Sequence, residues 1–133
     1  MNSTYFLNCV SGNVFNTKAD PALPTTYYLG LSTTAPDAEG GNVSEPGSGS
    51  GYARVQLTNL SEPTGGKITN SQSISFNEST SSWGVVTHYV IYDALTGGNL
   101  LMYGELDPPR TVDPATIMTI KDGYLELSVL NPA

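Results

Sequence analysis

The chain has 133 residues, 13% of them charged, and its 12 acidic residues against 5 basic ones give a net charge of −7. This length fits one domain with a single hydrophobic core. A nucleic-acid partner needs clustered Lys and Arg, and an anionic membrane surface attracts the same residues, so the composition argues against both partners. No stretch approaches the roughly 20 apolar residues that span a bilayer, and we expect no membrane insertion.

Cysteine usage narrows the class further. The chain has one cysteine, Cys9, which excludes an internal disulfide and a multi-cysteine zinc site. We expect Cys9 to be a small buried apolar residue. The N-terminus lacks the basic start and long apolar run of a secretory signal, which favours synthesis and folding in a cytoplasm.

Residues 1–24 are expected to form an N-terminal segment packed on a β domain of residues 25–133. Between residues 2 and 15, apolar residues recur at helical spacing, and Asn2 or Ser3 is a suitable cap. This pattern predicts one short helix. Residues 16–24 contain two prolines and are predicted to be a loop.

The first predicted strands flank a long loop. Residues 25–34 alternate apolar side chains onto one face, at Tyr27, Leu29 and Leu31. Residues 35–51 are rich in glycine and proline, and a loop of this length is usually functional or disordered. The second predicted strand covers residues 52–57. Residues 61–70 are predicted to be a turn region.

The strongest pattern is a hairpin of residues 84–93 and 98–106, which follows a short strand at residues 73–76. Both faces of residues 84–93 carry large apolar side chains, so this strand is either covered on both sides or contacts a neighbouring subunit. The two prolines of residues 107–110 are expected to end the pairing, because proline cannot donate a ladder hydrogen bond.

The C-terminal part predicts a last strand pair, residues 116–120 and 124–130, joined by a turn at Lys121-Asp122-Gly123. With about six to eight short strands separated by turn signals, the chain is predicted to be all-β. The expected architecture is an antiparallel β-sandwich or partly open barrel with a short N-terminal helix.

No catalytic or metal-binding set is evident in the sequence. The single histidine, His88, lies in a predicted strand, where it is expected to hydrogen-bond a neighbour rather than act as a base. Asp93 lies five residues further on, so it points to the opposite face of a regular strand. Asp37, Glu39 and Glu45 are too sparse for a calcium loop. We therefore expect no enzymatic activity, no cofactor and no metal.

Structural or interaction roles are expected for Trp83, Tyr52, Glu45, Arg54 and His88. Trp83 is interpreted as a lid on one end of the core whose N–H meets a loop carbonyl, and the alternative is a sugar-stacking platform. Tyrosine suits both strands and contact surfaces, so Tyr52 fits either place. A Glu45–Arg54 ion pair would hold the long loop against the sheet, and an exposed pair would contribute about 1 kcal/mol or less.

Several motifs occur here in an unusual combination. They are Tyr28-Leu29-Gly30-Leu31-Ser32-Thr33, Glu45-Pro46, Gly51-Tyr52-Ala53-Arg54-Val55, Ser82-Trp83-Gly84-Val85-Val86-Thr87-His88 and Gly97-Gly98-Asn99-Leu100-Leu101. Over residues 25–130 the chain resembles a family of small structural proteins of tailed bacteriophages, described as tail-fibre-like or minor virion proteins.

The resemblance implies a non-enzymatic virion protein that is made in the host bacterial cytoplasm. It also implies a place at the tail tip or tail fibre, with itself and other virion proteins as partners and a host-surface glycan or receptor as a further one. Uncovered sheet edges are natural surfaces for a homo-oligomer. Two alternatives stay open, a capsid decoration or cement protein and a carbohydrate-binding module.

Overall fold

The computed structural model describes residues 1–17 and 23–128, which form one helix and a set of antiparallel strands. The elements in chain order are α1 (Thr4–Val14), β1 (Tyr28–Ser32), β2 (Val55–Gln56), β3 (Lys67–Thr69), β4 (Ile74–Ser75), β5 (Gly84–Tyr92), β6 (Leu100–Val112), β7 (Thr119–Ile120) and β8 (Glu126–Ser128). The prediction of an all-β, sandwich-like fold with a short N-terminal helix is confirmed. The sheets of the described residues do not close into a barrel.

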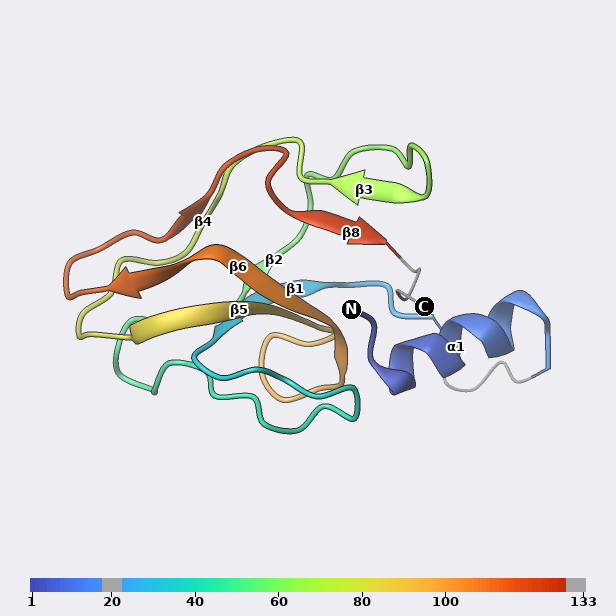
Figure 1. Cartoon of the computed structure of the whole chain (residues 1–133), viewed down its shortest axis with the longest axis horizontal. Helices are drawn as coiled ribbons and strands as arrows, with labels where there is room; N and C mark the ends of the chain where they lie inside the picture. Colours follow the sequence, from blue (N-terminus) through green and yellow to red (C-terminus); the bar gives the residue numbers. More distant parts are fainter. Residues whose placement is uncertain (18–22, 129–133) are drawn as a thin grey trace.

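The strands form two layers. A four-stranded sheet in the order β2-β1-β5-β6 is one layer, and the small sheets β3-β8 and β4-β7 lie over it (Figure 1). The main core lies between the layers, since buried residues of both belong to one cluster, among them Leu29, Leu31, Phe76, Ile91 and Leu127.

The opposite face of the main sheet carries a second, smaller core. Val90, Tyr92 and Leu100 are buried there, and Val43 of the long loop packs against them. In Figure 1 this loop runs in blue-green below β5 and β1. The loop of residues 35–51 is therefore a folded cover for the sheet, and one chain covers both faces of the C-terminal end of β5, where Val90, Ile91 and Tyr92 are buried.

Proline does not end β6, contrary to the prediction. The strand continues through Pro108 and Pro109 to Val112, and the two prolines lie where the register with β5 shifts. His88 pairs with Glu105, and the next pair joins Val86 to Arg110. Since β6 is an edge strand of the sheet, the missing proline N–H groups cost little, and an irregularity in the ladder accommodates them.

The C-terminal hairpin is also different from the prediction. Strand β7 pairs with β4 and strand β8 pairs with β3, so the two segments do not pair with each other. The predicted turn is present, with the backbone N–H of Tyr124 donating to the carbonyl of Lys121. The buried side chain of Asn70 holds this connection, because its amide donates to the carbonyl of Lys121 and its oxygen accepts from Leu125 N–H. Residues 129–130 of the predicted strand lie outside the described residues.

Strand β3 lies within residues 61–70, which were predicted to be only a turn region. Short strands without clear alternation carry a weak local signal, and here the pairing partner β8 lies more than fifty residues away in the sequence. The prediction failed because tertiary pairing decides this segment.

The N-terminal helix is capped by Ser3, one of the two predicted cap residues. Ser3 Oγ accepts a hydrogen bond from the backbone N–H of Phe6 and donates to the carbonyl of Leu100. The backbone N–H of Ser3 also bonds the carbonyl of Leu101, which anchors the start of α1 to the edge of β6. Cys9 is buried as expected. Most of the predicted loop at residues 16–24 falls on 18–22, outside the described residues.

Candidate functional site

The predicted Glu45–Arg54 pair is present and is more buried than a surface pair. Arg54 Nη2 lies 2.6 Å from Glu45 Oε1, and Arg54 Nε donates to Glu45 Oε2 over 3.0 Å. The two side chains are 7% and 22% exposed. This two-bond geometry fixes the relative position of the planar guanidinium and the carboxylate.

Arg54 also holds the turn between β5 and β6. Its Nη1 donates to the carbonyls of Ala94 and Gly97, each over 2.8 Å. Its guanidinium carbon lies 3.7 Å from the centre of the Tyr92 ring, an arrangement in which the cation is attracted to the aromatic face. One side chain thus joins the long loop, the segment before β2 and the β5–β6 turn.

Tyr52 completes this group, which we call the Arg54 cluster (Glu45, Tyr52, Arg54 and Tyr92). The Tyr52 hydroxyl donates to Glu45 Oε2 and accepts from the backbone N–H of Leu31. A Cβ atom at Gly30 would lie 2.5 Å from the Tyr52 hydroxyl oxygen, so only glycine fits beneath it.

The electrostatics of the cluster follow from burial and from the carboxylate. Burial and the hydrogen bond to Glu45 raise the pKa of Tyr52. Burial alone acts to lower the pKa of Arg54, but the hydrogen bond to Glu45 and its negative charge raise it overall. Both groups therefore stay protonated, and the carboxylate of Glu45 is held between two donors.

Trp83 belongs to the main core. It is 4% exposed, and its Nε1–H donates to the carbonyl of Ser50 over 2.9 Å. Its ring meets those of Tyr52 and Phe76 edge-on, with centroids 5.4 and 6.4 Å away. The lid interpretation matches this geometry, whereas Trp83 as a sugar-stacking platform is wrong because its faces are covered.

His88 is not brought to the Arg54 cluster. Its Nδ1 lies 2.8 Å from the hydroxyl of the neighbouring Thr87, and it pairs across the ladder with Glu105. Within residues 1–17 and 23–128, no group of three or more His, Cys, Asp or Glu side chains is placed to hold a metal ion.

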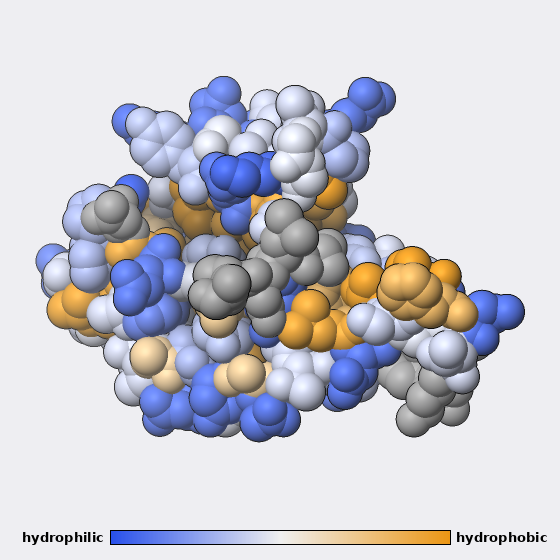
Figure 2. Space-filling view, turned by 45° about the vertical axis from the view of Figure 1, so that its right-hand side comes forward, coloured by the Kyte–Doolittle hydropathy of each residue, from blue (hydrophilic) through white to orange (hydrophobic). Residues whose placement is uncertain are grey.

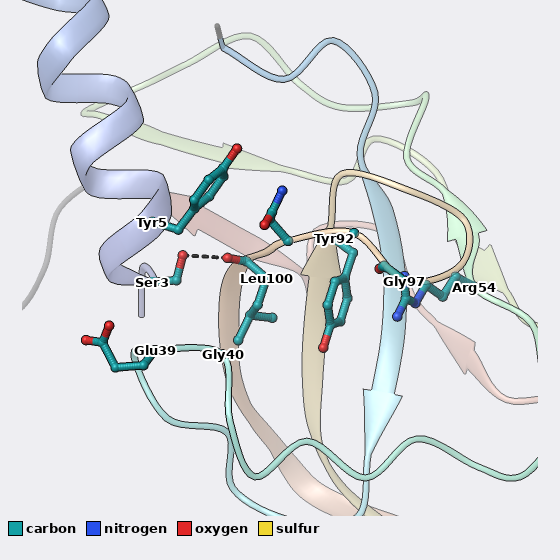
Figure 3. A pocket seen from close by; sticks show the side chains of 10 residues that line it. Ser3, Tyr5, Glu39, Gly40, Arg54, Tyr92, Gly97 and Leu100 are labelled. Atoms are coloured by element: carbon teal, nitrogen blue, oxygen red, sulfur yellow. Dashed lines mark hydrogen bonds between the residues drawn. The ribbon is translucent and has the colours of Figure 1, made fainter. Parts of the chain in front are cut away.

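A polar cavity of about 330 Å³ lies beside the Arg54 cluster (Figure 3). Tyr5 from α1, Glu39 from the long loop and Asn99 from the β5–β6 turn line it together with Arg54 and Tyr92. Sequence reasoning did not select Tyr5, Glu39, Tyr92 or Asn99 as site residues. Their segments are distant in sequence, and the local signal that bears on the cavity is the Gly97-Gly98 pair between the two strands of the predicted hairpin.

That turn has a fixed internal structure. Asp93 Oδ1 accepts from the backbone N–H of Asn99 over 2.8 Å, and Asp93 Oδ2 accepts from the Asn99 amide over 3.1 Å. Gly98 has φ +77°, and a Cβ there would lie 2.5 Å from Asp93 Oδ1. The cavity wall formed by the turn is therefore preorganised.

Across the part of the chain that the structure describes, α1 included, no helix has the length and apolar character needed to cross a membrane.

A search of the curated proteins finds no match. The sequence model of the family described as "Podophage GP4 fiber I protein gp80" matches residues 2–128. This match covers the N-terminal helix, both sheet layers and the Arg54 cluster. The chain therefore belongs to the family of the podophage GP4 fiber I protein gp80.

Proposed function

We propose that this protein is a non-enzymatic component of the tail fibre or tail tip of a tailed bacteriophage, where it mediates assembly and contacts the host surface. The family match over residues 2–128 is the observation that carries the proposal. Because the family description names a fiber protein, it favours a tail position over the alternative of capsid decoration. The β-rich fold with polar loops is compatible with repeated contacts between virion proteins.

Electron microscopy of phage particles tests the position. Particles labelled with gold-conjugated antibodies against the full chain should carry gold at the tail fibres or tail tip. Label distributed over the capsid would support decoration instead and would overturn the proposed position. Particles of a phage lacking the gene provide the control for antibody specificity.

Self-association is part of the proposal, and α1 offers a surface for it. Figure 2 shows hydrophobic residues gathered over α1 at the right of the view. Val14 and Phe15, at the C-terminal end of the helix, are 65% and 75% exposed. Large apolar side chains exposed next to each other are typical of interaction surfaces.

The mass of the full chain in solution, measured by light scattering after size exclusion, tests this surface. We expect a multimer for the native chain and a lower mass for Phe15→Ser. Tyr124→Ser is the matched control, because Tyr124 is also 75% exposed but lies in the turn before β8. A monomeric native chain, or an equal mass for all three proteins, would contradict self-association through α1.

We also infer that residues 1–24 act as a segment docked on the domain of residues 25–133. The hydrogen bonds from Ser3 to the carbonyls of Leu100 and Leu101 support this division.

A further inference from the structure

The cavity beside the Arg54 cluster is assembled from segments that are far apart in the sequence. It lies between the first turn of α1, the loop at Glu39 and Gly40, and the β5–β6 turn (Figure 3). Hydrogen bonds fix each of these walls. The Thr4 hydroxyl donates to Glu39 Oε1 over 2.7 Å, and Arg54 holds the carbonyl of Gly97. A cavity with fixed walls can select a ligand without reorganising.

Charge excludes ionic ligands from this cavity. Arg54 is the cation of the lining, but its guanidinium is already bound to Glu45 and to the carbonyls of Ala94 and Gly97. The exposed carboxylate of Glu39 and the net charge of −7 oppose an anion further. A metal cation would meet a single carboxylate in the lining, that of Glu39, and this carboxylate already accepts a hydrogen bond from the Thr4 hydroxyl. A neutral ligand therefore has a lower electrostatic cost of binding in this cavity than an ionic ligand.

The lining favours a ligand rich in hydroxyl groups. Tyr92 lines the cavity, and its hydroxyl, which has no hydrogen-bond partner within residues 1–17 and 23–128, can donate to a ligand or accept from it. The carboxylate of Glu39 and the amide of Asn99 add acceptors and donors. Tyr5 adds an aromatic ring on the helix side, and rings of this kind pack against the C–H faces of sugars.

Size limits the ligand to a small one. A volume of about 330 Å³ is at the lower end of the range for small-molecule pockets, which start at roughly 300 Å³. One sugar ring fits this volume, and a longer chain would extend out of the opening.

From these observations we propose that the cavity binds one ring of a neutral saccharide. The proposal deepens the host-contact part of the proposed function and rests on it for its biological purpose. Binding itself is measured on the isolated full chain, so a negative result would overturn the saccharide site and leave the labelling of tail fibres unaffected.

The experiment is a titration followed by amide NMR spectra. The probes are the methyl glycosides of glucose, galactose, mannose, N-acetylglucosamine and rhamnose, with dissociation constants expected on the order of 1 mM. At least one glycoside should shift the amide signals of Gly40, Gly98 and Asn99. Tyr92→Phe removes only the hydroxyl, and loss of one hydrogen bond should weaken binding about fivefold. Glu39→Ala, at an exposed position, should weaken it as well.

Tyr124→Phe is the control, because it removes a hydroxyl from an exposed tyrosine outside the cavity lining. Its affinity should equal that of the native chain. Four outcomes would overturn the proposal: no shift with any of the glycosides, shifts located away from the cavity, equal affinity in native and Tyr92→Phe proteins, or stronger binding of inorganic phosphate than of every glycoside. Spectra without ligand verify that each variant is folded.

Discussion

At Arg54, one buried side chain connects three segments that are separate in the sequence. Its guanidinium donates to two backbone carbonyls and to the carboxylate of Glu45, and the ring of Tyr92 covers one face of the group. The sequence was sufficient to predict the partner Glu45, because the two residues flank one glycine-rich loop. Ala94, Gly97 and Tyr92 could not be predicted, since they meet Arg54 only after β1, β2 and β5 have paired.

Arg54→Ala should destabilise the chain by about 3 kcal/mol, because it leaves the half-buried Glu45 carboxylate without its cation. Urea unfolding followed by the fluorescence of the single tryptophan, Trp83, measures this change. Limited proteolysis should also show faster cleavage within residues 37–50. Lys67→Ala is the matched control, because the Lys67–Glu126 pair is 58% and 56% exposed and should contribute about 1 kcal/mol or less. Equal losses in the two variants would refute the structural role of Arg54.

Alkaline pH should weaken the fold through Tyr52. Burial and the hydrogen bond to Glu45 raise its pKa above the ordinary value of 10.0, so the folded chain retains a proton that the unfolded chain releases. This stabilising contribution is complete below about pH 10 and is lost progressively as the pH rises further. Urea midpoints at about pH 8 and pH 11 should therefore differ.

Tyr52→Phe should reduce that difference, although it should not abolish it, because burial also raises the pKa of Tyr27, Tyr89 and Tyr92. Circular dichroism is the suitable signal, since ionised tyrosine disturbs tryptophan fluorescence. Tyr124→Phe, which alters an exposed ring, should retain the full decline. A Tyr52→Phe protein with an unchanged pH dependence would contradict this assignment.

Among the elements, the turn between β5 and β6 shows how local sequence and tertiary contacts combine. Two consecutive glycines predict a hairpin, and the structure has one there. The side chain of Asp93 then stabilises the turn, and Arg54 binds its carbonyls. The pairing of β3 with β8 and of β4 with β7 had no comparable local signal, because strands of two or three residues are fixed by the layer against which they pack.

The two glycines of this turn should respond differently to substitution. Gly98→Ala would place a Cβ 2.5 Å from Asp93 Oδ1 and 2.9 Å from the Ala94 Cβ, so we expect a loss of about 2–3 kcal/mol. Gly97→Ala has a similar φ, +62°, but its Cβ would meet nothing within 4 Å, and about 1 kcal/mol is expected. Urea midpoints of the two variants provide the comparison, and equal effects would show that the steric contact is unimportant.

For the whole molecule, Trp83 is a point at which the two layers are joined. The indole packs against Tyr52 beside β2 and against Phe76 beside β4, and it bonds the long loop through Ser50. It therefore connects the main sheet, the smaller sheets and the loop at one end of the core.

Trp83→Ala should cost about 3–5 kcal/mol, the range for removing a large buried aromatic side chain. Thermal unfolding followed by circular dichroism measures the loss, since the variant contains no tryptophan. Tyr124→Ala is a useful comparison, because that ring is 75% exposed and should change the unfolding temperature little. A native-like unfolding temperature for Trp83→Ala would mean that the layers are held together elsewhere.

The sequence by itself determined the all-β class, the N-terminal helix, the buried Cys9 and the Glu45–Arg54 pair, because alternation, capping and short loop closure are local properties. It was also sufficient to suggest the phage family. The tertiary structure decided that β6 continues past Pro108 and Pro109, that β7 and β8 pair with different partners, and that a polar cavity forms beside Arg54. Each of these features depends on segments far apart in the chain, whose contacts follow from packing two layers and a covering loop into one core.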